Sequence, residues 1–439
     1  MLRASSVQTR ISDSLSFSLS RKHNLLFLYQ HESRRYSNKM SQDFQRWFDE
    51  MMPKIINNLG PNVDNARYEL LESNNNFIMS NLYRVRLQFE NKRNGQKEEL
   101  SMILKRPMLG FSQLAHIDLQ FRNEILFYQM YTRPNEIYAR CIYAEEKPPI
   151  DSIIALENVN ERGYYSCPYP YDPPLEYTLA VMRELGRFHG KGYVMKERQR
   201  EKFFDIVARI QHVRYIKRVG NLYEHHLNIK TLRVIEYLRN QGYDAIFCDK
   251  MEALLSNAFD EVMMKSVQPS EPLATLCHGD FTLSNMLFKT EDDGQYRLLL
   301  IDFALITYST PVIDICTYLF ICCSNEVRKD KFSEIMLAYH DALKEYLWEA
   351  GIKDIEKYSY NALMDDFRKS ALFALPLMCN FSPILWGYLN PKILVQEIID
   401  LGPVESAKKR KYVGGDKVSK LLADALLHLR DLGCLNHIL

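Results

Sequence analysis

Apolar and polar side chains alternate in the first clear pattern along the chain. From Tyr83 to Phe89 every second residue is apolar and the residues between are Arg or Gln, as in a half-buried strand. Asn94-Gly95 follows as a dipeptide that tolerates positive φ in a tight turn. A second strand is predicted over Glu99 to Lys105, and it turns Lys105 to the face opposite to its leucine and methionine side chains.

Helical spacing replaces this alternation after residue 117. Phe121, Ile125 and Tyr128 recur at intervals of four and three residues, which predicts one apolar face of a helix. Asp118 precedes this face and is predicted to cap the helix. Glu124 borders the same face, so its carboxylate can point toward the sheet.

A further strand, Ile153 to Leu156, leads into Glu157-Asn158, and most of the remaining chain has helical periodicity. We therefore expect an α+β protein with a small β-rich N-terminal lobe and a larger, mainly helical C-terminal lobe. The predicted domains are a disordered or targeting extension at 1–40, an N-lobe at 41–156 and a C-lobe at 157–439. A chain of 439 residues is long enough for two such lobes.

Composition narrows the classes of partner. The 56 basic and 55 acidic residues give a net charge of +1, which argues for neither a nucleic-acid nor a membrane partner. No apolar run approaches the roughly 20 residues of a spanning helix. The nine scattered cysteines contain no CxxC pair, a pattern typical of reduced thiols in a cytosolic protein rather than of disulfides or a zinc site.

Residues 1–40 differ from the rest of the chain. Asp13 and Glu32 are their only acids, against seven Lys and Arg. A basic, acid-poor leader is typical of a mitochondrial transit peptide. The alternatives are an untargeted extension or an unused upstream start, since Met40 opens an amphipathic segment. We favour these alternatives, and with them a cytoplasmic protein.

The most informative segment, CHGDFTLSN, runs from Cys277 to Asn285 and is followed by LLLIDF, which carries Asp302. Phosphoryl transfer requires positioning and charge neutralisation more than covalent chemistry. Asp280 can accept or orient a hydroxyl proton, and Asn285 can return to the same site with a metal-binding amide oxygen. Asp302, after a buried strand, can reach a metal ion that bridges phosphates.

The N-terminal half supplies two matching charges. Lys105 is placed to neutralise the α- and β-phosphates of a nucleotide, and Glu124 can hold its ammonium by an ion pair. Taken singly, these two are ordinary surface charges and Asp302 ordinarily ends a strand. The order of the whole set, with Lys, Glu, HxD, Asn and strand-Asp in sequence, indicates a kinase.

These motifs resemble the ecdysteroid kinase-like (CHK kinase-like) family, which belongs with choline kinases and aminoglycoside phosphotransferases. The matching segments are LCHGDFTLSNMLF and LLLIDFALITYSTPVIDICTYLF, with MILKRP, FRNEILFY and ALENVNERGY upstream. The resemblance covers most of residues 40–439. It implies a two-lobed protein-kinase-like fold that binds ATP and Mg²⁺ between the lobes.

The resemblance also implies a role for each matching residue. Asp280 corresponds to the catalytic base, and Asn285 and Asp302 correspond to the magnesium ligands. Lys105 and Glu124 form the phosphate-holding pair. The remaining nucleotide-binding positions implied are Asn76 and Ser80 near the phosphate-covering loop, and Leu156, Glu157 and Asn158 in the hinge that meets adenine. Asp314 either braces the C-lobe or caps its own helix, and we favour the cap.

Three positions depart from the family pattern. The phosphate-covering loop reads SNNNF over residues 73–77 where the family usually has Gly, although Asn tolerates left-handed φ better than other residues. Phe281 replaces the usual Trp, and Ala304 replaces the usual Gln. These changes leave a catalytically inactive, ligand-binding pseudokinase as an alternative, but none affects a proton-transfer or metal position.

The substrate is expected to be a small hydroxylated molecule, such as an ecdysteroid. Choline, ethanolamine or a xenobiotic are alternatives, and the protein is expected to be a monomer or a weak homodimer. The stretch from Leu372 to Asn390 is rich in Met and aromatic residues, which line either a sterol-sized pocket or the core. We favour the core, a structural role for His189 and a solvated loop over 408–411.

Overall fold

The computed structural model describes residues 43–439 except 75–78, 109–114, 134–135 and 218–220. Asn76 and the expected extension at 1–40 lie outside these residues. The chain divides into two compact units. Of the described residues, the first unit comprises 43–68 and 88–99, and the second comprises the remainder.

The first unit contains a helix over residues 43–58 and the ends of three strands. Phe48 of the helix meets the edge of Tyr68, with ring centroids 5.5 Å apart. Asn65 donates a hydrogen bond of 2.9 Å to Glu90 across the strand ends. The Asn94-Gly95 turn is present as predicted, with Gly95 at a φ of 67°.

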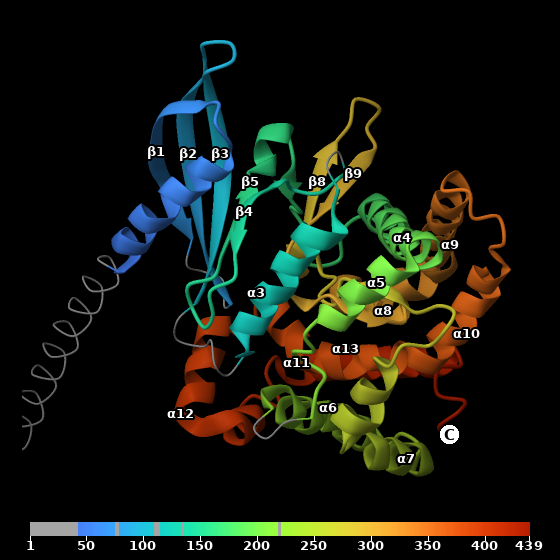
Figure 1. The fold of residues 1–439 in the computed structure, drawn as a ribbon. Coiled ribbons are helices and arrows are strands. Elements are labelled where there is room, and N and C mark those ends of the chain that lie inside the picture. The colour runs from blue at the N-terminus through green and yellow to red at the C-terminus, as the bar shows by residue number, and fades with distance from the viewer. Residues whose placement is uncertain (1–42, 75–78, 109–114, 134–135, 218–220) are drawn as a thin grey trace, which may run out of the picture. The chain divides into compact units, whose positions relative to one another are not determined.

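The N-terminal part of the described chain contains a five-stranded sheet in the order β1-β2-β3-β5-β4 (Figure 1). Its strand β3 lies antiparallel to β5, and Lys105 is opposite Ile154 in their register. The predicted strands around Val85, Leu104 and Ile154 are all confirmed, as is the opposite orientation of Lys105 and Leu104. The strands span β1 (Val63–Asn74), β2 (Ser80–Asn91), β3 (Gln96–Pro107), β4 (Cys141–Glu145) and β5 (Ile153–Glu157).

The predicted helix after the third strand is confirmed as α3 (Ile117–Leu126), which continues as a short π-helix, η1 (Phe127–Tyr131). The predicted cap is wrong. His116, in the left-handed region, precedes the helix, and Asp118 lies inside the first turn without accepting a capping bond. A carboxylate in the first turn still interacts favourably with the positive end of the helix dipole, which explains why its position resembled a cap.

The second unit is otherwise mainly helical (Figure 1), so the predicted α+β class with a β-rich N-terminal part is confirmed. Its helices are α4 (Leu175–Arg198), α5 (Arg200–Arg209), α6 (Leu222–Asn240), α7 (Ala245–Leu255), α8 (Val312–Cys322), α9 (Asn325–Glu349), α10 (Tyr360–Ser370), α11 (Ala374–Leu385), α12 (Pro391–Lys409) and α13 (Gly415–Asp431). The short strands are β6 (Tyr165–Ser166), β7 (Thr275–Cys277), β8 (Met286–Thr290), β9 (Tyr296–Leu300) and β10 (Thr307–Ser309).

Helix α8 lies at the centre of the helical core. Every residue from Val312 to Cys322 is buried, as expected for a helix in which most residues are apolar and lie on every side. Helices α4 and α9 pack closely against each other because Gly186, on α4, has no side chain. A Cβ at this position would lie 2.3 Å from the backbone oxygen of Tyr339.

Two further predictions concern the C-terminal region. Phe373 and Met378 are buried in the core, as we favoured, whereas Phe381 is only partly buried and reaches the site described below. The basic run from Lys408 to Lys411 is not a free loop, because it begins within α12 and pairs with Glu405, Glu397 and Glu236.

A lipid bilayer cannot be crossed by any helix of the described part of the chain, since none combines sufficient length with an apolar composition.

Candidate active site

The HGD segment follows strand β7, which pairs with β10 so that Cys277 is opposite Thr307. Gly279 has a φ of 79°, a conformation that is unfavourable for residues with a side chain. A Cβ at Gly279 would also lie 1.9 Å from the backbone oxygen of Leu305. The glycine therefore permits both the turn that presents Asp280 and the close packing of this turn against the segment after Asp302.

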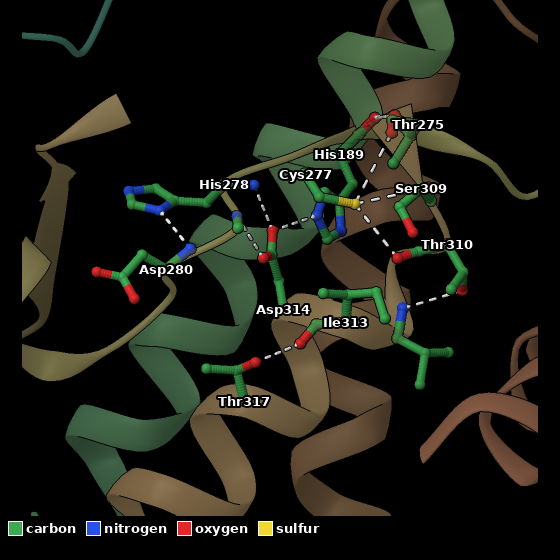
Figure 2. A network of polar contacts seen from close by, with 12 residues as sticks. His189, Thr275, Cys277, His278, Asp280, Ser309, Thr310, Ile313, Asp314 and Thr317 are labelled. Atoms are coloured by element: carbon green, nitrogen blue, oxygen red, sulfur yellow. Dashed lines mark hydrogen bonds and ion pairs between the residues drawn. The ribbon is translucent and has the colours of Figure 1, made fainter. Parts of the chain in front are cut away.

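Asp314 of α8 fixes the backbone of this turn (Figure 2). Its carboxylate accepts hydrogen bonds from the backbone N–H groups of His278, at 2.6 Å, and Gly279, at 2.9 Å. The prediction that Asp314 caps its own helix is wrong, because both of its oxygens accept from the HGD turn, while the Thr310 hydroxyl accepts from the N–H of Val312 at the start of α8. The backbone of the turn offers two N–H donors at closer reach, so the alternative bracing role describes Asp314.

His189 lies behind Asp314 and is fully buried. Its Nε2 is 3.2 Å from Asp314 and its Nδ1 is 2.9 Å from the hydroxyl of Tyr339. Cys277 lies close to the same cluster, but its thiol donates to the backbone oxygens of Ser309 and Thr310. Because these groups already bond one another or the backbone, the cluster is a polar support for the HGD turn, which agrees with the predicted structural role of His189.

Asn285 closes the turn on its other side. Its amide nitrogen donates to the backbone oxygen of Asp280 at 2.8 Å and to Asp280 Oδ2 at 3.0 Å. The backbone oxygen of Asn285 accepts from the N–H of Ile301 at 3.1 Å, which links it to the residue before Asp302. The predicted spacing of five residues thus brings the amide directly to the carboxylate.

A buried ammonium joins two of the other predicted charges. Lys105 Nζ donates to Glu124 Oε2 at 2.6 Å and to Asp302 Oδ1 at 2.8 Å. Glu124 is buried with 1% of its surface exposed, whereas the Asp302 side chain is 41% exposed. The structure therefore brings together a strand residue, a helix residue and a loop residue that are far apart in sequence, with one of the two carboxylates open to solvent.

The three charges shift one another's protonation. Burial opposes the charge on Lys105, but Asp302 and Glu124 outweigh it and raise the lysine pKa above its ordinary value. Complete burial raises the pKa of the Glu124 carboxyl to about 7, despite the opposing effect of Lys105. Desolvation also acts on Asp302, but the neighbouring ammonium prevails and lowers its pKa. Asp302 is thus the carboxylate that stays ionised.

Asp302 itself has unusual backbone geometry. Its φ of 65° and ψ of 67° place a residue with a side chain in the left-handed region, where strained residues of functional sites are concentrated. The following Phe303 is fully buried and stacks on Phe127, with ring centroids 3.5 Å apart. The packing of Phe303 holds the loop in this conformation and presents Asp302 to Lys105.

The predicted hinge residues lie at the end of β5. The N–H of Glu157 donates to the oxygen of Arg140 at 2.9 Å, and the N–H of Asn158 donates to the oxygen of Ser101 at 3.0 Å. Leu156 pairs with Ile103 in the sheet. Ser80 is buried at the start of β2. Both hinge N–H groups thus already have partners within the protein.

Sequence reasoning missed Arg214, whose guanidinium pairs with the Asp280 carboxylate. Its two terminal nitrogens lie 3.1 Å from Asp280 Oδ1. Arg214 belongs to an irregular segment between α5 and α6 and is 66 residues from Asp280 in sequence. No motif or periodicity marks it, so the sequence offered no local signal.

A cavity of about 420 Å³ borders Arg214 and Gly279. Its walls come from four segments: the end of α5 with the residues after it, the end of the π-helix η3 (Phe259–Met264) with the residues after it, the HGD turn and the loop after Asp302. Most of the lining is apolar, and among the described residues that form it Arg214 is the one Lys, Arg, Asp or Glu. The lining residues are Val207, Ile210, Gln211, His212, Val213, Arg214, Tyr215, Ile216, Met264, Val267, Gln268, Pro269, Gly279, Leu305, Ile306, Thr307 and Tyr308.

Solved structures of kinases are similar to this chain. An ethanolamine kinase from Plasmodium vivax shares 10% identity over 84% of this chain and 83% of its own, with a TM-score of 0.38. The GDP complex of wild-type aminoglycoside 2'-phosphotransferase-IIIa shares 13% identity over 81% of this chain and 92% of its own, with a TM-score of 0.36.

No curated protein matches the chain. The TM-scores of the solved structures lie below 0.5, so the family assignment depends on sequence. The model of the ecdysteroid kinase-like family matches residues 74–352. This match spans more than half of the chain, including all four charges of the site and the HGD turn. The chain belongs to the ecdysteroid kinase-like family.

Proposed function

We propose that this protein is a small-molecule kinase that transfers the γ-phosphate of ATP to a hydroxyl group. In this proposal Asp280 orients the hydroxyl and accepts its proton, while Asn285 and Asp302 hold Mg²⁺. Lys105, held in place by Glu124, neutralises the α- and β-phosphates. The observation that carries the proposal is the buried ammonium shared between Glu124 and Asp302.

The burial of these three charges contributes little to folding stability, so a role in chemistry is the better explanation for it. Burying an ion pair gains little stability, because desolvation offsets the Coulomb attraction. A third charge adds repulsion between the two carboxylates, and this repulsion acts together with the larger effect of burial to raise the pKa of Glu124. Charges held under such strain are concentrated at functional sites. A cation between one buried and one solvent-open carboxylate suits a site that receives phosphates and a metal ion.

The donor atoms fit magnesium. Mg²⁺ prefers oxygen ligands and is usually held by one or two carboxylates together with substrate phosphates. Asp302 supplies an ionised, partly exposed carboxylate. Because the amide nitrogen of Asn285 is engaged with Asp280, its amide oxygen remains as the second protein ligand. When bound, the ion would neutralise charge on the phosphates during transfer.

The chain's own residues perform the remaining tasks. Asp280 is presented by the HGD turn with its Oδ2 held by Asn285, and it takes up the proton that the acceptor hydroxyl loses. Lys105 keeps the phosphates in line with that hydroxyl, since transfer depends on positioning. We propose that Asn76 and Ser80 lie near the phosphates. The backbone of Leu156, Glu157 and Asn158 would meet adenine, with carbonyl groups accepting because the Glu157 and Asn158 N–H groups are engaged.

We place the acceptor in the cavity beside Arg214 and Gly279. Its largely apolar lining suits the body of a hydroxylated apolar compound such as an ecdysteroid or a xenobiotic. Choline would instead need acidic and aromatic groups around a quaternary ammonium, and the part of the lining that the structure describes contains no Asp or Glu. The cavity therefore favours the apolar acceptor over choline or ethanolamine.

The test is transfer of label from γ-labelled ATP by the full chain with Mg²⁺. The acceptors are an ecdysteroid, a plant phenol, choline and ethanolamine. We expect label on the ecdysteroid or the phenol, and its loss when EDTA removes the metal ion. Binding of Mg²⁺-ATP without transfer to any acceptor would support the pseudokinase alternative and contradict the proposal. Transfer to choline alone would overturn the placement of an apolar acceptor.

A larger side chain on one wall, which makes the cavity smaller, tests the acceptor site. Met264 lines the cavity from the end of η3 and is only partly buried, so Met264→Trp fills space without replacing a core residue. We expect the KM of the acceptor to rise about tenfold, the cost of a poorly fitting pocket, with the KM of ATP unchanged. Met264→Leu is the matched control, because it keeps the volume. An unchanged acceptor KM in the tryptophan variant would exclude this cavity.

A further inference from the structure

We infer that Arg214 is a positioning residue that orients the Asp280 carboxylate, so that the acceptor hydroxyl meets Oδ2. This inference rests on the proposed function and extends it to a residue outside the kinase motifs. Arg214 is supplied by the segment between α5 and α6, remote in sequence from the HGD turn. Four observations support the assignment.

The first observation is how the two oxygens of Asp280 are used. Arg214 Nη1 and Nη2 both donate to Oδ1 at 3.1 Å. The Asn285 amide donates to Oδ2 at 3.0 Å. An ionised carboxylate offers about four acceptor positions, two on each oxygen. Arg214 fills both positions on Oδ1 and Asn285 fills one on Oδ2, so the position left for a hydroxyl is on Oδ2.

The second observation is that the guanidinium cannot turn freely. Its central carbon lies 5.6 Å from the ring centroid of Tyr223 and 5.1 Å from that of Phe381. Arginine interacts favourably with aromatic rings at such distances. Only 11% of the Arg214 side chain is exposed. The two rings therefore hold the planar donor group in one orientation toward Asp280.

The third observation is that two asparagines fix the backbone around Arg214. The buried Asn123, on α3, donates to the backbone oxygen of Gln211 at 2.9 Å and accepts from its N–H at 2.8 Å. Asn221 donates to the backbone oxygens of Arg214, at 3.3 Å, and Ile216, at 2.8 Å. An irregular segment lacks the bonds of a helix or sheet, so these side chains set its course.

Asn123 also connects this segment with the rest of the site. The same amide nitrogen donates to the backbone oxygen of Ala304 at 3.2 Å, two residues after Asp302. Glu124, the partner of Lys105, is the next residue on α3. One turn of α3 thus sets the position of the Arg214 segment, the loop after Asp302 and Lys105 together.

The fourth observation concerns Asp280 itself, whose side chain is 32% exposed. A carboxylate with this access to water needs no counterion of its own for folding. The buried guanidinium does need one, but neutralisation does not require both of its terminal nitrogens to meet a single carboxylate oxygen. The fork on Oδ1, held by two rings, instead orients the carboxylate.

The variants Arg214→Gln and Arg214→Lys test the inference in the full chain. Glutamine removes the charge, while lysine keeps it but cannot place a fixed fork of two N–H groups on one oxygen. We expect the glutamine variant to lose about 10²-fold in kcat, as for a misplaced catalytic group, with the KM of ATP within about twofold of wild type. Arg239→Gln is the matched control, because Arg239 pairs with Asp249 and Glu252 on the exposed side of α6.

Two readouts separate positioning from a merely structural role. If Arg214 acts through Asp280, the double variant Arg214→Gln, Asp280→Asn will have the kcat of Asp280→Asn alone. Multiplied losses, or a kcat of wild-type size in both Arg214 variants, would overturn the inference. If the glutamine variant does not fold, the lysine variant carries the same test.

Crystal structures of wild type and the variants give an answer that does not depend on turnover. We expect the Asp280 carboxylate to rotate, or to occupy two orientations, once the fork is removed. An unchanged single orientation would overturn the inference, whatever the activity. If wild type transfers no phosphate to any acceptor, the proposed function fails, and the crystal comparison still decides whether Arg214 orients Asp280.

Discussion

Replacing Asp280 by Asn is expected to reduce kcat/KM for phosphate transfer about 10³-fold. The amide keeps the size of the carboxylate but cannot accept a proton from the acceptor hydroxyl. Positioned general bases contribute roughly 10²–10⁴-fold to enzymatic rates. Affinity for Mg²⁺-ATP should change little, because the proposed nucleotide ligands are other residues. The measurements are steady-state kinetics and calorimetric titration with ATP.

Asp205→Asn is the matched control for this variant. Asp205 also pairs with an arginine, Arg209, at 3.1 Å, but on the exposed surface of α5, so its loss should leave kcat/KM unchanged. Thermal unfolding should change little for Asp205→Asn, because both members of that pair are exposed. Asp280→Asn should lower the unfolding midpoint, because the Arg214 side chain, only 11% exposed, loses its charged partner. Retention of more than a tenth of wild-type kcat/KM by Asp280→Asn would contradict its assignment as the base.

The charges of the site could be found from sequence because each depends on local pattern. The spacing of five residues between Asp280 and Asn285 brings the Asn285 amide to Asp280, where it donates two hydrogen bonds. The alternation around Lys105 and the helical stripe beside Glu124 gave the faces on which these two residues lie. Period and spacing are properties of short segments, so no tertiary contact had to be known for these predictions.

Other parts of the site depend on tertiary contacts and could not be predicted. Arg214 is placed by Asn123 and Asn221, which are 91 positions before it and seven after it, and no local pattern connects these residues. Asp314 illustrates the same point: the start of a helix suggested a cap, but the backbone of the HGD turn lies close enough to take its carboxylate. The cavity in which we propose that the acceptor binds has walls from four separate segments, which no single stretch of sequence reveals.

Replacing Lys105 by Met is expected to have the second largest effect, on both transfer and stability. Kinetically, loss of the phosphate-holding ammonium should lower kcat/KM by about 10²-fold or more. For stability, the variant leaves Glu124 buried beside Asp302 without a cation. Removing one partner of a buried pair typically costs about 3–5 kcal/mol.

The pH dependence of this loss follows from Glu124. In wild type its pKa is raised from 4.5 to about 7, so the native state holds a proton that the unfolded chain releases. Stability from this group is therefore fully present below pH 4.5 and is lost as pH rises through about 7. Methionine removes the ammonium that lowers this pKa, so the loss in the variant continues above pH 7.

We therefore expect wild type and Lys105→Met to differ by a constant amount below pH 7 and to diverge above it. The gap should grow by about 1.4 kcal/mol for each further pH unit, the free-energy equivalent of one pKa unit. Thermal unfolding midpoints between pH 6 and pH 9 measure this divergence. In the double variant Lys105→Met, Glu124→Gln the buried carboxyl is absent, so the divergence should disappear. A gap that does not depend on pH, or one that persists in the double variant, would show that Glu124 does not titrate as the geometry requires.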